Sequence, residues 1–132
     1  MPSPLPPSLR LRSGEDPAPG VVVTKAVIRA AERLGLTARV LAGAIGVSEA
    51  TVSRMKKGGA GLEPDSKPFE LALLLIRLFR SLDAIVGGDD AVAAAWLASP
   101  NAALAARPVE KLQTISGLVD VIAYLDARRA LV

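Results

Sequence analysis

Hydrophobic residues recur every three or four positions over most of this chain, which is the spacing of amphipathic helices. The first such series predicts a helix that Thr24 caps and Gly35 ends, after a short extended segment at residues 21–23. A later series predicts a final helix that begins after Thr114. The buried face of this final helix is expected to consist of Leu118, Val121, Ile122 and Leu125.

Residues 69–86 are apolar on nearly every side for about five helical turns. A helix with that pattern is buried all round. We expect it to be the central helix of the fold and to be shared with a second copy of the chain. Shorter helical segments follow, with Asp89 and Asn101 as N-caps and Pro108 in a first turn.

Residues 38–57 have the layout of a helix-turn-helix. Gly46 stands at the sharp turn between the two helices, where only glycine enters positive φ without a steric cost. Ser48 stands where an N-cap is needed, and Val52 and Met55 turn back toward the core. An ordinary helical hairpin in an all-α core has similar spacing. A small residue in the first helix, a glycine at the turn, an apolar residue beneath the turn and an N-cap occur together here. This combination favours DNA binding.

The outward side of the second helix carries polar and basic residues suited to a DNA major groove. Glu49 can accept from a cytosine amino group, or it can simply favour the first turn of its helix. Other residues are expected to contact phosphates, which position the protein without specifying a sequence. The predicted DNA-binding residues are Thr37, Ser48, Glu49, Thr51, Arg54, Lys56 and Lys57.

Composition narrows the possible classes of protein. Apolar residues make up 51% of the chain and only four residues are aromatic, which favours closely packed helices over a sheet. A chain of 132 residues cannot bury that much apolar surface by itself, so we infer a large partner-facing surface. Because cysteine and histidine are absent, we expect no catalytic site, no metal site and no cofactor. No membrane span or signal peptide is predicted, which favours a cytoplasmic protein.

The excess positive charge lies in the front half of the chain. Residues 1–66 hold nine Lys/Arg and six Asp/Glu, whereas residues 67–132 hold seven of each. This distribution favours phosphate attraction at the helix-turn-helix and a different partner for the neutral half. Because the excess is modest, we expect two copies to bind one duplex at a palindromic operator, with half-sites about 34 Å apart.

Three spaced motifs mark the back half of the chain. They are W-L-x-S-P-N-x-A-L at 96–104, R-P-x-x-x-L-x-T at 107–114 and G-L-x-x-V-x-x-Y-L-D-x-R at 117–128. Together they resemble the toxin-binding domain of the Xre/MbcA/ParS antitoxins, which that family places behind a helix-turn-helix. The resemblance covers roughly residues 22–132. One departure is Ala105-Ala106, where many members have Gly-Gly before the Arg-Pro pair.

The resemblance implies an all-α antitoxin that forms a homodimer and covers the active site of a RES-type toxin. Toxins of that kind act on NAD, and the antitoxin–toxin complex represses its own operon through the helix-turn-helix. The expected organisation is a disordered, proline-rich arm at residues 1–20, a helix-turn-helix DNA-binding domain at 21–62 and a helical dimerisation and toxin-binding domain at 63–132. The implied partners are the cognate toxin, operator DNA and a second copy.

We expect the C-terminal helix to enter the toxin's active site, because aromatic residues and arginines dominate binding energy in desolvated pockets. Its carboxylates can imitate substrate phosphates, or its arginines can pair with catalytic acids. The predicted toxin-binding residues are Asp120, Tyr124, Asp126, Arg128 and Arg129. A stand-alone helix-turn-helix repressor with a ligand-binding helical domain is the alternative, and adjacency to a RES-type gene separates the two.

Overall fold

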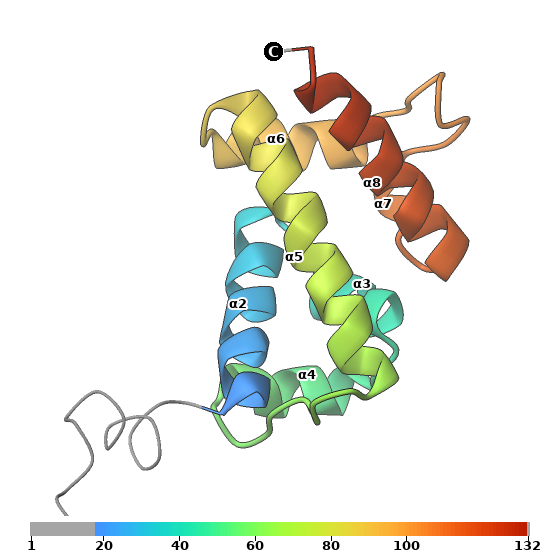
Figure 1. Cartoon of the computed structure of the whole chain (residues 1–132). Coiled ribbons are helices and arrows are strands. Elements are labelled where there is room, and N and C mark those ends of the chain that lie inside the picture. Colours follow the sequence, from blue (N-terminus) through green and yellow to red (C-terminus); the bar gives the residue numbers. More distant parts are fainter. Residues whose placement is uncertain (1–17, 132) are drawn as a thin grey trace, which may run out of the picture.

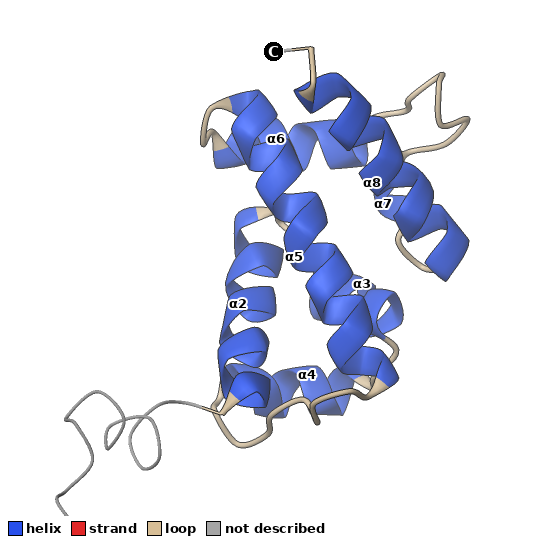
Figure 2. Cartoon of the chain, viewed as in Figure 1, coloured by secondary structure: helices blue, strands red, loops and turns tan. Residues whose placement is uncertain are grey.

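The computed structural model describes residues 18–131, and the regular secondary structure in this span is entirely helical (Figures 1 and 2). The all-α fold expected from the sequence is therefore confirmed. None of these helices is sufficiently long and apolar to cross a membrane. In chain order the helices are α2 (Pro19–Arg33), α3 (Ala38–Ile45), α4 (Glu49–Lys56), α5 (Lys67–Val86), α6 (Asp90–Ala98), α7 (Pro108–Lys111) and α8 (Ile115–Arg129).

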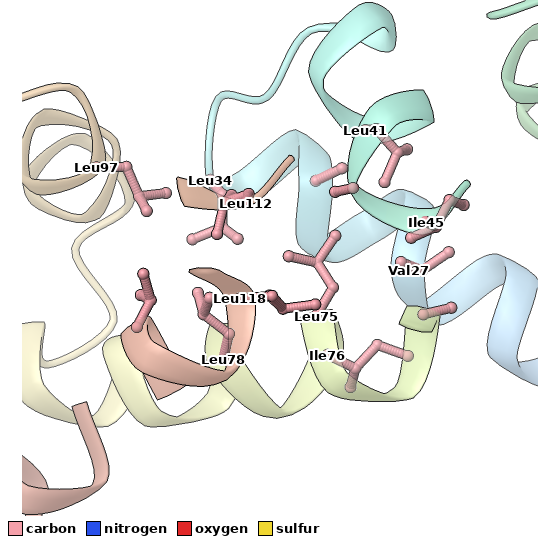
Figure 3. Packing of buried hydrophobic residues seen from close by; sticks show 14 of the residues in the cluster. Val27, Leu34, Leu41, Ile45, Leu75, Ile76, Leu78, Leu97, Leu112 and Leu118 are labelled. Carbon is pink, nitrogen blue, oxygen red and sulfur yellow. The ribbon is translucent and has the colours of Figure 1, made fainter. Parts of the chain in front are cut away.

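Helix α5 runs through the middle of the molecule, with α2 along one side and α8 along the other (Figure 1). Helices α3 and α4 pack near its N-terminal half, and α6 packs at its C-terminal end. The buried hydrophobic residues form one continuous cluster, in which leucines from several helices interdigitate around Leu75 and Leu78 (Figure 3). The helix-turn-helix and the back half therefore share a single core built on α5.

Helix α2 begins earlier than the sequence pattern predicts. The segment 21–23 is helical rather than extended, and the helix starts at Pro19, whose fixed φ suits a first turn. Thr24 is not a cap: its buried hydroxyl donates to the carbonyl of Gly20 and accepts from the amide of Leu62 at 2.9 Å. This residue therefore fastens the α4–α5 loop onto α2.

Within a single chain, helix α5 is buried on one side, and its burial on the other side by a second copy stays a prediction. The side that faces α2 and α8 is buried, and Leu75 and Leu78 are inaccessible there. The opposite edge is open to solvent, with Leu73 45% exposed and Arg77 and Arg80 also exposed. Helices α2 and α8 cover only two flanks of α5, so this edge is left without a cover among residues 18–131.

The predicted caps of the back half are present. Asp89, Asn101 and Thr114 each accept a hydrogen bond from the amide three residues later, at 3.0–3.2 Å. The turn that begins at Asn101 closes with an isolated bridge to Ala106. Between them Ala105 has φ +57°, a left-handed conformation that suits glycine better than alanine. Ala105 therefore occupies a conformation that is strained for a residue with a Cβ.

Candidate DNA-binding and toxin-binding surfaces

The helix-turn-helix predicted at residues 38–57 is formed by α3 and α4. Gly46 ends α3 with φ +75°, as the turn requires. Ser48 caps α4, its hydroxyl accepting from the Thr51 amide at 3.0 Å. Val52 is fully buried and Met55 nearly so, which fixes the rotation of α4 about its axis. The side of α4 opposite these two residues is the one available to DNA.

A short hydrogen-bond chain orders one edge of α4. Ser48 Oγ donates to Thr51 Oγ1 at 3.0 Å, and Arg54 Nη2 donates to the same oxygen at 3.0 Å. The guanidinium of Arg54 is thus held along the edge of the helix before DNA is bound. Thr51 is half-buried, whereas Arg54 and Lys57 are exposed. The structure therefore links Thr51 and Arg54 directly, and it leaves Lys57 exposed just beyond the last residue of α4.

Lys56 lies to one side of this surface, beside α2. It lines a shallow depression with Lys25 and Arg29 of that helix. Glu49 is exposed in the first turn of α4, and no residue within 18–131 forms an ion pair with it. Both roles considered for Glu49 therefore remain compatible with its position.

The first turn of helix α3 is a second candidate region for DNA contact. Thr37 caps the helix, accepting from the Val40 amide at 3.1 Å, so its own hydroxyl hydrogen stays free to donate. Arg39 is exposed next to it and forms no ion pair among the described residues. A hydroxyl, a helix N-terminus and a guanidinium gathered in one place suit a phosphate group.

Three exposed residues of this surface are missing from the predicted set of DNA-binding residues. Ala50 lies on the side of α4 opposite Val52 and Met55, and Ser53 is exposed on the flank of that side. The sequence pattern places both residues on the outward side of this helix, although neither is among the predicted contact residues. Arg39 is the third, and its basic side chain two residues after Thr37 is the signal that could have identified it.

An aromatic stack joins α6 and α8 at the other end of the molecule. The rings of Trp96 and Tyr124 are half-buried and stacked, with centroids 5.9 Å apart and an interplanar angle of 20°. The guanidinium of Arg128 lies 5.8 Å from the centre of the Tyr124 ring. Arginine over tyrosine adds a cation–π attraction to the stack. We call these three residues the aromatic cluster.

The other predicted toxin-binding residues of α8 do not join the aromatic cluster. Asp120 forms an ion pair with Lys111 of α7, at 3.3 Å. Asp126 points instead toward α5, where it accepts from Arg77 at 2.5 Å and from Ser81 at 3.0 Å. Arg129 lies on that same side and lines a groove with α2 and α5. The predicted set is therefore divided between two sides of α8.

Each half of the chain matches a known protein family. Residues 16–77 match the antitoxin Xre-like helix-turn-helix domain, and residues 81–130 match the antitoxin Xre/MbcA/ParS C-terminal toxin-binding domain. The chain belongs to the Xre-type antitoxins. No curated protein matches it. The predicted resemblance and the order of the two domains are confirmed.

These matches place the antitoxin in a type II toxin–antitoxin system and indicate DNA and a toxin as its partners. Antitoxin and helix-turn-helix regulator families are typically non-enzymatic. The two matched segments meet within α5, whose N-terminal part falls in one and whose C-terminal part falls in the other. One helix thus serves both the DNA-binding and the toxin-binding domain.

Proposed function

We propose that this antitoxin neutralises a RES-type, NAD-consuming toxin by covering its active site, and that it represses its own operon by binding operator DNA as a homodimer in the cytoplasm. The aromatic cluster carries the toxin half of the proposal. It lies on the domain that matches the toxin-binding family, and it combines the residue types that dominate binding energy at protein interfaces.

The stacking within the aromatic cluster favours tight binding. Trp96 and Tyr124 restrain each other, and Arg128 is held against Tyr124, so little side-chain freedom remains to be lost on binding. Of the two ways in which α8 can engage an active site, this geometry favours arginine pairing with catalytic acids. Asp120 and Asp126 already accept from neighbouring cations and are poorer substitutes for substrate phosphates.

The DNA half of the proposal rests on the exposed face of α4 and the first turn of α3. Ser53, Arg54 and Lys57 are exposed together on the recognition helix. Thr37 and Arg39 lie at the N-terminus of α3, where a phosphate is attracted by the helix dipole. A homodimer would place two such surfaces on a palindromic operator, with half-sites about 34 Å apart.

Rescue of growth tests the toxin half of the proposal. The product of the neighbouring RES-type gene is expressed with wild-type antitoxin or with variants. We expect the wild type to restore growth, and Tyr124→Ala combined with Arg128→Glu to abolish rescue. Lys67→Glu is the control, because Lys67 is 82% exposed on α5 and lies outside the aromatic cluster. Rescue by the double variant at equal expression contradicts the role given to this cluster.

Binding of promoter DNA tests the DNA half of the proposal. The antitoxin alone and its complex with the toxin are titrated against the promoter of their own operon at low salt. We expect retardation of the promoter fragment and a footprint with two-fold symmetry. The DNA half of the proposal fails if neither the antitoxin nor the complex binds this fragment more tightly than an unrelated one.

A further inference from the structure

A groove separates α8 from α2 along the open edge of α5. Its volume is about 790 Å³, and its walls come from all three helices. Val22 and Val23 belong to α2, Ile76 to α5 and Arg129 to α8. One wall of the groove therefore comes from the segment that matches the helix-turn-helix family, and another comes from the segment that matches the toxin-binding family. It lies on the side of α8 that carries Asp126 and Arg129, away from the aromatic cluster.

Apolar side chains make up much of the groove's lining. Val23 and Ile76 are each 9% exposed and form the floor. Val22 and Leu73 stand at the rim, 50% and 45% exposed. Two large aliphatic side chains beside a concave surface indicate a site for apolar groups of a partner.

Cations surround this apolar surface. Arg80 and Arg129 line the groove, and Lys25 and Arg29 line a second depression of about 360 Å³ that shares Arg80 with it. None of these four cations forms an ion pair within residues 18–131. The carboxylate that lines the groove, that of Asp126, is already bonded to Arg77 and Ser81.

We infer that this groove, which we call the arginine groove, binds an acidic segment of the toxin that also carries apolar side chains. The cations without an ion pair favour an anionic partner, because complementary charges attract across an interface. The aliphatic rim favours a protein segment over a nucleic-acid backbone. A second copy that placed its own arginine groove face to face would oppose cation to cation. The inference rests on the proposed toxin partner, because the toxin-binding domain supplies one wall.

The arginine groove therefore extends the toxin interface from α8 across α5 to α2. The toxin would contact the helix-turn-helix domain directly, rather than only the domain matched to toxin binding. Two contact regions on opposite sides of α8 would hold the toxin around that helix. Each region can be disrupted separately, because neither Tyr124 nor Arg128 lines the groove.

The test measures the dissociation constant of the purified full-length antitoxin for the toxin. Arg80→Glu combined with Arg129→Glu is expected to weaken binding about tenfold or more, since each reversal turns attraction into repulsion. Leu73→Ser is expected to weaken binding by about threefold through lost apolar contact. The controls are Lys67→Glu, which has the charge change of one of the two arginine reversals, and Val92→Ser, since Val92 is 49% exposed on α6. Both controls are expected to bind as the wild type does.

Unchanged toxin affinity in both groove variants overturns the inference and leaves the proposed function standing if the wild type still binds the toxin. Absence of toxin binding by the wild type overturns both. Sedimentation of the variants tests whether a second copy occupies the groove. Their affinity for promoter DNA tests whether nucleic acid occupies it. If the groove variants alter self-association or DNA binding while toxin affinity is unchanged, the occupant is a second copy or nucleic acid, and the inference is wrong.

Discussion

Gln113, in the turn between α7 and α8, donates from Nε2 to the backbone carbonyl of Val40 in α3 at 3.1 Å. Gly43, one turn further along α3, leaves room for this side chain: a Cβ at that position would lie 1.8 Å from Gln113 Oε1. A hydrogen bond and a close approach thus join the toxin-binding domain to the first helix of the helix-turn-helix. Through this contact the region before α8 helps to position α3, whose first turn is proposed to contact DNA.

A double-mutant cycle measures this contact. Gly43→Ala gains about 1 kcal/mol of helix propensity but displaces Gln113, so its effect on the free energy of unfolding is expected to be near zero. In a Gln113→Ala background the same change is expected to stabilise by about 1 kcal/mol, because nothing is displaced. Urea unfolding of the four proteins gives the coupling energy. Equal effects of Gly43→Ala in both backgrounds would show that the contact contributes nothing.

Relief of strain at Ala105 is expected to stabilise the antitoxin. Ala105→Gly removes the Cβ from a residue at φ +57°, with an expected gain of about 0.5–1 kcal/mol in the free energy of unfolding. Ala103→Gly in the same turn is the control, because Ala103 does not have positive φ. That variant is expected to be neutral or slightly destabilised. The midpoint of thermal unfolding should therefore rise for Ala105→Gly and should stay the same or fall slightly for Ala103→Gly. A decrease for Ala105→Gly would contradict the strain at this position.

The buried hydroxyl of Thr24 is expected to hold the α4–α5 loop on α2. Thr24→Val keeps the shape of the side chain but leaves the Leu62 amide without its acceptor, at a cost of about 1–3 kcal/mol. Thr24→Ser keeps the hydroxyl and is expected to cost less. Denaturant unfolding followed through the single tryptophan compares the two variants. A serine variant less stable than the valine variant would show that packing of the methyl group matters more than the hydrogen bond.

Arg39 is expected to contact a phosphate rather than a base. Arg39→Ala should weaken binding to operator and unrelated DNA by a similar factor, and it should lower the slope of log K against log salt by about 0.9. Fluorescence anisotropy titrations at several salt concentrations measure both quantities. Arg128→Ala, at the far end of α8, serves as the control and should leave the slope unchanged. A loss confined to operator DNA would instead indicate base contact.

The sequence predicts the elements that depend on local signals. Ser48 and Thr114 are caps, as expected, because N-capping depends on a residue and the amides that follow it within one turn. Gly46 has the positive φ that the turn needs for the same local reason. The family resemblance, which rests on spaced motifs, is confirmed as well.

Features set by tertiary packing could not be predicted in the same way. The hydrophobic run of α5 gives no indication that one edge stays open, because the number of helices that cover it depends on the whole fold. Thr24 has the residue type of a cap, yet its role is set by Leu62, which is 38 residues away. Asp126 and Arg129 are close to Tyr124 in sequence, but the rotation of α8 against α5 turns them to another side. The arginine groove exists only once α2, α5 and α8 are assembled.

The central claim is that the back half of this antitoxin covers the active site of an NAD-consuming toxin. The most direct measurement is the rate of NAD consumption by the purified product of the neighbouring gene, titrated with this chain. We expect the rate to fall to the background level at a fixed stoichiometry, and to stay high when the Tyr124→Ala, Arg128→Glu double variant is added instead. An undiminished rate with excess wild-type antitoxin would contradict the account.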